Sequence, residues 1–518
     1  MSLQVRSLGE TSAWRSLQCW FLSSVYLVPV LLVSLLGSPW SLAQSSEAKP
    51  PDVTLRGTLS GKDNQTYKLL PFSVPQGIFR VTVVFSYSGK DEHTAVDLGL
   101  FDPQQFRGWS GGRKDVFTVS ATDATPSYLP GFVVPGVWQL LIGVPNIRTA
   151  SRSEYVAKIY FSGAGSVSAE PEVLRAPLKS GPAWFRGDLH MHTAHSDGSC
   201  QSQSGKSVPC PLMLTVQTAA KRGLDFIAIT DHNSISHYSE MRELQPFFDQ
   251  LLLIPGRELT SFTGHANLYG TEEYVDFRVG SAEVPNWNAL LRNLQKMDGL
   301  VSVNHPSRLT GEDCMGCGWT PDPPADLHLV QAIEAINSGR TEGPTAGITF
   351  WHEQLNRGIR LTAIGGGDNH NALAPLPGMG SIGYPTTVVR ARELSVGGVL
   401  ESIRAGHVFI DVAGTADRLL ELTADLQHQH AEMGDNLSVQ EKQLVSFQVH
   451  VRKVLGGRVE VNSDSGLLTL DLPPITQADQ TLQFPWESDG RRHWLQATVR
   501  DASGNLILLG NPIYINFP

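Results

Sequence analysis

Two histidines spaced two residues apart give the first indication of chemistry in this chain. His190 and His192 lie at the end of a short apolar run, in a segment that reads Asp-Leu-His-Met-His-Thr-Ala-His-Ser-Asp-Gly over residues 188–198. Side chains two apart on a strand point the same way, so both imidazoles can reach one metal ion. Asp197 follows on a loop, and a carboxylate beside two imidazoles suits Zn, Mn or Fe better than a soft metal.

The pair alone is weak evidence. With 16 histidines among 518 residues, a His-x-His arises by chance about once in every two such chains, the usual false-positive risk of a short motif. His428 and His430 form a second pair in a polar stretch without partners, which we interpret as solvated surface. The first pair must therefore be judged by the residues that accompany it.

Further ligand-type residues follow successive apolar runs between residues 181 and 414. A parallel barrel brings the carboxyl ends of all its strands to one face, so these side chains would meet there. A single histidine after a strand is more often capped or solvated than a ligand, so the joint occurrence carries the inference. The candidate ligands are His190, His192, Asp197, His232, Glu258, His265, His305, Asp368 and His370. Asp231 we interpret as a helix N-cap or as a partner of a ligand.

The elements that must position these residues alternate in type. Short apolar runs lie at residues 224–230, 251–255, 266–269, 300–303, 332–336 and 361–364. Helical patterns lie between several of them, at residues 212–222, 286–297 and 346–357. This alternation predicts parallel strands joined by crossover helices, in a barrel or an open α/β sheet.

The chain is long enough for about three domains. Residues 44–180 alternate β-rich runs with turn residues and lack a helical period, which predicts an antiparallel sandwich serving as an accessory domain for sugar, partner or surface binding. Residues 181–414 carry the candidate site. Residues 415–518 return to strands, which predicts a small C-terminal β domain.

Taken together, the motifs resemble those of the PHP (polymerase and histidinol phosphatase) family of metal-dependent hydrolases. The four motifs of that family are similar to residues 190–198, 230–232, 304–306 and 368–370, and Glu258 and His265 match intermediate positions. The N-terminal segment, the flanking β domains and the closing Gly-Asn-Pro-Ile at residues 510–513 are similar to the CehA/McbA-like branch, named for carbamate ester hydrolysis.

The resemblance implies a distorted (β/α)7 barrel that holds two or three divalent ions of Zn, Mn or Fe. It implies that the ligands of the first ion are His190, His192, Glu258 and Asp368. Those of the second would be Glu258, His265 and His305, with Glu258 bridging the two. Those of the third would be Asp197, His232 and His370.

The metals would supply most of the chemistry. Two ions on one solvent molecule lower its pKa towards neutrality and yield a hydroxide nucleophile, while an ion also polarises the phosphoryl or acyl oxygen. Glu258 and Asp368 would act through these ions. His195 and Arg308 lie near motif residues and could contact an anionic substrate, although a surface role explains each equally well.

These features predict a hydrolase of small-molecule esters, with phosphoesters as the first expectation. The alternatives are a carboxylic or carbamate esterase and a non-catalytic binding protein with a structural metal site. Arginines and lysines around the metals would favour phosphate, and an apolar pocket would favour the other esters. The formal net charge of −10 and the pI near 5.9 argue against sequence-independent nucleic-acid binding.

The N-terminus predicts export to the periplasm or the extracellular space. Arg6 and Arg15 precede an apolar run at residues 19–37, and Ser-Leu-Ala at residues 41–43 offers a cleavage site. An uncleaved membrane anchor is the alternative. In an exported protein we expect Cys200 with Cys210, and Cys314 with Cys317, to form disulfides rather than zinc knuckles or a redox-active pair.

Overall fold

The computed structural model describes residues 49–517 except 113, 164–175 and 313. The predicted targeting segment at residues 1–43 lies outside the described residues. Among the described residues, no helix has both the length and the apolar character needed to cross a membrane.

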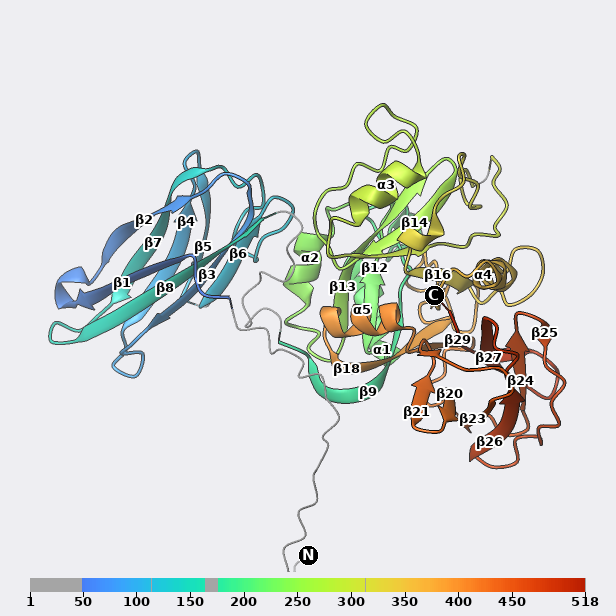
Figure 1. The fold of residues 1–518 in the computed structure, drawn as a ribbon. Coiled ribbons are helices and arrows are strands. Elements are labelled where there is room, and N and C mark those ends of the chain that lie inside the picture. Colours follow the sequence, from blue (N-terminus) through green and yellow to red (C-terminus); the bar gives the residue numbers. More distant parts are fainter. Residues whose placement is uncertain (1–48, 113, 164–175, 313, 518) are drawn as a thin grey trace, which may run out of the picture. The chain divides into compact units, whose positions relative to one another are not determined.

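The N-terminal part is all β and consists of two four-stranded antiparallel sheets (Figure 1). Its strands are β1 (Val53–Ser60), β2 (Thr66–Val74), β3 (Ile78–Tyr87), β4 (Ala95–Phe101), β5 (Phe106–Gly111), β6 (Val116–Ser120), β7 (Gly136–Asn146) and β8 (Arg152–Gly163). The sheets have the orders β1-β8-β3-β6 and β2-β7-β4-β5. Alternate side chains of each strand point inward and share one core, which includes the fully buried Trp138.

The central part contains one long sheet with five helices around it (Figure 1). Its strands are β9 (Lys179–Asp188), β12 (Phe226–Ile229), β13 (Leu252–Ser261), β14 (Gly264–Tyr269), β15 (Leu300–Val303), β16 (Ala332–Asn337), β17 (Thr362–Gly366), β18 (Thr386–Leu394) and β19 (Val408–Asp411). A separate short hairpin is formed by β10 (Ser199–Gln201) and β11 (Ser207–Pro209).

Three of the five central helices were predicted from the sequence. The helices are α1 (Leu212–Lys221), α2 (Tyr238–Leu244), α3 (Trp287–Leu294), α4 (Gly347–Asn356) and α5 (Val396–Ala405). The helical patterns correspond to α1, α3 and α4. The start of α3 is set by Asn286, whose side chain accepts a hydrogen bond from Ala289 N at 3.0 Å. The prediction missed α2, which is short, and α5, which begins with two glycines after Val396.

The prediction of uniformly parallel strands was wrong at β14. β12 pairs in parallel with β9 and β13, and β16 pairs in parallel with β15 and β17. β14 instead runs antiparallel to both β13 and β15. Only Phe262 and Thr263 separate β13 from β14, and a two-residue connection forms a hairpin, because a parallel crossover needs a dozen residues or more.

A closed (β/α)7 barrel is not shown by the strand pairing. Among the described residues, β17 is the last strand at one end of the sheet, and the other direction continues past β9 through β18 and β19. The segments that follow β9 and β17 nevertheless meet, because Met191 and Asn369 form an isolated parallel bridge. His192 N donates to Asn369 O at 2.7 Å. The first and last ligand-bearing segments therefore lie side by side.

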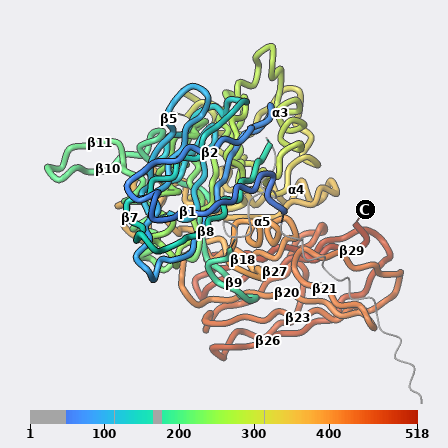
Figure 2. The backbone as a smooth tube through the Cα atoms, turned by 90° about the vertical axis from the view of Figure 1, so that its left-hand side faces the viewer, coloured from blue at the N-terminus to red at the C-terminus, as the bar shows by residue number. Residues whose placement is uncertain are grey.

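The C-terminal part also consists of strands, drawn in orange to red in Figure 2. One of its sheets continues the central sheet. Its strands are β20 (Leu419–Leu426), β21 (Gln429–Glu432), β22 (Asn436–Leu437), β23 (Leu444–Arg452), β24 (Arg458–Ser463), β25 (Gly466–Leu467), β26 (Asp479–Glu487), β27 (His493–Arg500), β28 (Leu506–Gly510) and β29 (Ile513–Ile515). β28 pairs antiparallel with β19 of the central part. A second sheet, β21-β20-β23-β26, packs on this continuation over a shared apolar core.

Asn511 joins the C-terminal part to the site-bearing sheet. Its side chain accepts from Ala363 N at 2.8 Å and donates to Ala363 O at 3.0 Å and to Val408 O at 2.9 Å. The residue is 1% exposed. Because Ala363 belongs to β17, this one amide anchors the strand that precedes Asp368.

We expect Asn511→Ala to destabilise the protein by about 2–4 kcal/mol, because it leaves buried backbone groups without partners. The measurement is the midpoint of denaturant unfolding. Asn293→Ala, at an exposed position on α3, should change the free energy of unfolding by less than about 0.5 kcal/mol. Equal midpoints for the two variants would contradict this role of Asn511.

Candidate metal centre

All nine predicted ligands fall into groups whose donor atoms could share a metal ion. Three groups matter: His190, His192 and Asp368 with Glu258 beside them; Glu258, His265 and His305; and Asp197, His232 and His370 with His192. Cys317 also lies near His265 and His305, but its sulfur is part of a disulfide and does not ligate. We call these the first, second and third positions.

The first position is formed by four buried side chains. Nε2 of His190 lies 3.1 Å from Nε2 of His192. Oε2 of Glu258 lies 3.4 and 3.5 Å from these two nitrogens, and Oδ1 of Asp368 lies 3.5 and 3.4 Å from them. Neighbouring ligands of a tetrahedral ion with bonds of about 2.0–2.1 Å are separated by about 3.3 Å. The observed spacings fit such an ion.

The second position uses the other oxygen of Glu258. Oε1 lies 3.2 Å from Nδ1 of His265 and 3.3 Å from Nε2 of His305. One carboxylate therefore turns one oxygen to each of two positions, which is the arrangement of a bridging ligand. Asn304 Nδ2 donates to the same Oε1 at 2.8 Å and holds the carboxylate in place.

The third position is open to solvent. Oδ2 of Asp197 lies 3.4 Å from Nε2 of His370 and 3.7 Å from Nε2 of His232. The side chain of Asp197 is 56% exposed, whereas that of Glu258 is 1% exposed. His192 also belongs to this group, with its Nδ1 3.8 Å from Asp197 Oδ1. The resemblance implied His192 for the first position alone.

Buried atoms without hydrogen bonds support metal binding. Nδ1 of His192, Nδ1 of His265 and Oε2 of Glu258 are buried and make no hydrogen bond among the described residues. Leaving such atoms unpaired costs free energy. Each atom faces a candidate ligand atom of a different position, so a cation at each of the three positions would satisfy it. The residues therefore fit divalent ions.

The electrostatics of the site determine the charge of each candidate ligand. Burial opposes the charge of His190, His232 and His370, but the facing carboxylates outweigh it and raise the pKa of each ring, so a bound ion would displace their protons. Burial opposes the charge of Glu258, but the surrounding histidines outweigh it and hold the pKa of Glu258 well below its usual range. The pKa of Asp368 is lowered for the same reason. Burial lowers the pKa of His192 to about 4, so this ring is neutral at pH 7. Anionic carboxylates and a neutral imidazole are the forms that bind metals.

The sequence did not predict the role of Glu334, which supports His190. Oε1 of Glu334 lies 2.6 Å from Nδ1 of His190, and Glu334 is fully buried. It fixes that ring as the carboxylate partners of metal-bound histidines do. In the sequence, the sign of this role is a single glutamate inside the apolar run at residues 332–336. Asp231 was predicted as a helix N-cap or as a partner of a ligand. The next helix, α2, begins only at Tyr238, so Asp231 is not an N-cap. It accepts hydrogen bonds from Thr193 N and Thr193 Oγ1, both at 2.7 Å, next to His192 in the chain.

The backbone at two ligands is unusual. His305 has a φ of 28° and Asp368 a φ of 51°, in a region that residues other than glycine rarely adopt. Before Asp368, a Cβ on Gly366 would lie 2.1 Å from Glu334 Oε1 and 2.7 Å from His190 Cβ. Glycine at this position therefore lets β17 approach the first position closely.

The two predicted substrate-binding residues differ in their placement. Arg308 Nη1 contacts Asp368 Oδ2 at 2.8 Å, so its guanidinium lies at the first position. Both ring nitrogens of His195 are engaged, Nδ1 with Ser236 Oγ at 2.7 Å and Nε2 with Glu240 Oε2 at 3.1 Å. In this arrangement His195 offers a substrate no free ring nitrogen.

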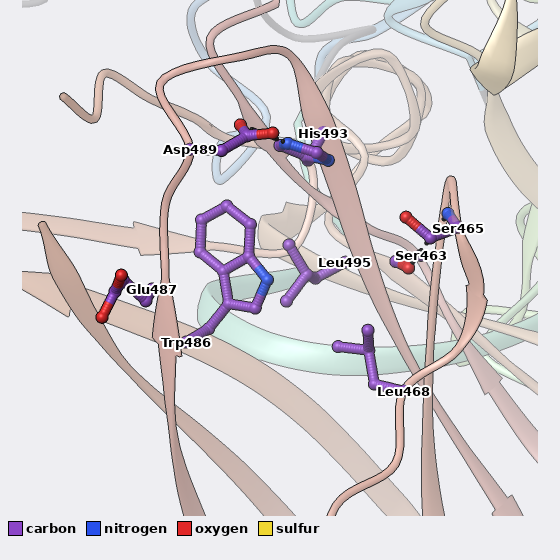
Figure 3. A pocket seen from close by; sticks show the side chains of 8 residues that line it. All are labelled: Ser463, Ser465, Leu468, Trp486, Glu487, Asp489, His493 and Leu495. Atoms are coloured by element: carbon purple, nitrogen blue, oxygen red, sulfur yellow. Dashed lines mark hydrogen bonds and ion pairs between the residues drawn. The ribbon is translucent and has the colours of Figure 1, made fainter. Parts of the chain in front are cut away.

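Histidines elsewhere do not form a comparable centre. His430 contacts Asp425 at the surface, and among the described residues no group capable of holding a metal includes His428 or His430. A cavity of about 160 Å³ in the C-terminal part is lined by Trp486 and His493, among others (Figure 3). Both ring nitrogens of His493 are already bound to carboxylates at 2.8 Å.

Comparison with known proteins found similarity among solved structures alone. No family model matches the chain, and no curated protein matches it. Among solved structures, a two-domain protein from Bacteroides vulgatus that contains a predicted PHP-like metal-dependent phosphoesterase is 16% identical. The match covers 66% of this chain and 97% of that one, with a TM-score of 0.35. At this score the likeness carries no argument about function.

We expect Glu258→Gln to lower the number of divalent ions bound per chain, because the neutral amide removes the charge that serves two positions. Elemental analysis of the purified variant measures this. Glu240→Gln, which removes a carboxylate outside the three positions, should keep the ion content of the unsubstituted protein. An unchanged ion content in Glu258→Gln would contradict the bridging role.

Proposed function

We propose that this chain is an exported metal-dependent phosphoesterase of the PHP type. The observation that carries the proposal is the arginine at the first position. One oxygen of Asp368 faces the two histidines there, and its other oxygen contacts Arg308. A guanidinium beside the ligands provides the cationic contact that a phosphate group requires.

A second arginine strengthens the preference for phosphate. Burial lowers the pKa of Arg340, and the positive charge of Arg308 lowers it further while Asp368 opposes the shift. Arg340 Nη1 lies 3.4 Å from Asn337 Oδ1, and Asn337 Nδ2 donates to Glu334, the partner of His190, at 3.0 Å. One arginine in contact with a candidate ligand and a second near its partners favour phosphoesters over carboxylic and carbamate esters, because the latter carry no charge to neutralise.

Bound divalent ions would activate water and polarise the scissile ester. The chain's own residues would hold and orient the substrate. Arg308 would bind an anionic phosphoryl oxygen and position it against the ions, and charge stabilisation of this kind grows in a water-poor site. The fully buried His190 and Glu258 exclude water from the inner side of the centre.

Two further parts of the proposal rest on the sequence with support from the fold. Export is supported by the disulfides Cys200–Cys210 and Cys314–Cys317, since such bonds persist in oxidising compartments. The CehA/McbA-like branch is supported by the Gly-Asn-Pro-Ile segment, in which Asn511 has the structural role described above.

We expect Arg308→Met to lower kcat/KM for aryl phosphates about 10²–10³-fold, the range seen when one charge-stabilising donor is removed. Hydrolysis of aryl acetates should change less than tenfold. The measurement compares kcat/KM for p-nitrophenyl phosphate with kcat/KM for p-nitrophenyl acetate. Arg292→Met, on an exposed position of α3, is the control. Faster hydrolysis of acetates or carbamates than of phosphates would favour the esterase alternative.

Removing the ions should abolish hydrolysis and lower the Tm, because the ions bind the folded state alone. At an ion concentration of 100 times the Kd, binding adds about 2.7 kcal/mol to the free energy of unfolding. Dialysis against a chelator, followed by calorimetry and by activity assays after adding back Zn, Mn or Fe, tests this. Metal binding without hydrolysis of any ester would leave the binding-protein alternative.

A further inference from the structure

The two histidines of the second position are held by one loop. His265 Nε2 contacts Met315 O at 3.3 Å, and His305 Nδ1 contacts Cys317 O at 2.8 Å. Both acceptors are backbone carbonyls of the short loop that Cys314 and Cys317 close by a disulfide. We call residues 314–317 the disulfide loop.

These contacts determine which nitrogen each ring presents. A carbonyl oxygen only accepts, so the ring nitrogen that faces it must carry the hydrogen. His265 therefore keeps the lone pair of Nδ1, and His305 keeps that of Nε2. These are the atoms that lie 3.2 and 3.3 Å from Glu258 Oε1. The disulfide loop thus sets the tautomer and the orientation of both ligands, as partners of metal-bound histidines generally do.

The loop depends on close packing and on its covalent bond. Gly316 has a φ of 76°, and a Cβ there would lie 2.0 Å from Ser261 O, so the loop sits directly on the end of β13. The segment has no helix or strand of its own. Two backbone hydrogen bonds of 3.2 Å join Gly311 and Cys314. The disulfide joins the two ends of the loop and so restrains the backbone that carries both carbonyls.

The other two positions do not use this loop. His190 Nδ1 contacts Glu334 at 2.6 Å, and His232 Nδ1 contacts Thr260 Oγ1 at 2.6 Å. His370 Nδ1 contacts the backbone oxygen of Asp368 at 3.0 Å. Opening the loop therefore acts directly on the second position alone.

We propose that the Cys314–Cys317 disulfide is a positioning element for the second position, so that the chain holds its full set of ions only when this bond is formed. The proposal rests on the metal centre of the proposed function. In a reducing compartment the chain would bind fewer ions, and formation of the disulfide after export would complete the centre.

Reduction provides the first test. A water-soluble phosphine, which avoids thiol chelators, cleaves the S–S bond to two thiols and is itself oxidised to the phosphine oxide with an oxygen from water. The oxidised protein, and the reduced protein with its thiols alkylated so that Cys317 cannot bind zinc beside His265 and His305, are stripped of ions and titrated with Zn²⁺ against a chromophoric competitor. We expect one binding step to weaken about 10–100-fold, as when a partner of a ligand is removed, with the others unchanged.

Substitution provides the second test. Cys314→Ser with Cys317→Ser should reproduce the weakened step without reductant, while circular dichroism shows that the fold is kept. Cys200→Ser with Cys210→Ser removes the other disulfide and should leave the affinity of the second position unchanged. Adding the Cys314 and Cys317 substitutions to His265→Ala, where this position is already weakened, should weaken that step little further.

The outcomes separate the two proposals. Titrations of the oxidised, reduced and substituted proteins that agree within twofold would overturn the role of the disulfide and leave the metal centre intact. Equal weakening of every binding step would also overturn it, because it would indicate general loosening. If the oxidised protein binds no divalent ion, the proposed function fails and the positioning role fails with it.

Discussion

The centre is organised around the buried carboxylate of Glu258. A charge with 1% exposure is costly to bury unless it is paired. Histidines from four separate segments face its two oxygens, namely His190 with His192, His232, His265 and His305. Each of these rings must then be held by a further partner, which explains the position of Glu334 and of the carbonyls in the disulfide loop. The local packing follows from one charge that requires cations nearby.

The candidate ligands were predictable because they follow strands. The sequence shows where a strand ends and which residue comes next, and parallel strands carry their carboxyl ends to the same edge. These two observations were sufficient to predict that His190, His232 and Asp368 lie at the same edge of the sheet. They were not sufficient for Glu334, since a glutamate within a strand carries no sign of the histidine that it contacts. Such partners depend on how neighbouring strands are aligned, which the sequence of one strand does not encode.

The topology was less predictable than the ligands. Apolar runs give strands but not their direction, so β14 was placed as another parallel strand although its short turn requires a hairpin. The role of Asn511 could not be predicted from the sequence for a similar reason. Its three hydrogen bonds reach residues 148 and 103 positions away, and no local pattern reveals a contact at such distance. The helices with clear apolar periodicity, such as α3, were predicted from the sequence.

The candidate ligands differ in exposure to solvent across the centre, and this difference would determine how readily each bound ion exchanges. The third position is open, whereas the side chains of the first are buried, with none more than 8% exposed. An ion bound at the open position would exchange with the surrounding medium. An ion bound at the buried position would need local opening of the structure to leave, and would therefore exchange more slowly. The inner ion would then reflect the metal supply at the time of folding, and the outer ion that of the present surroundings.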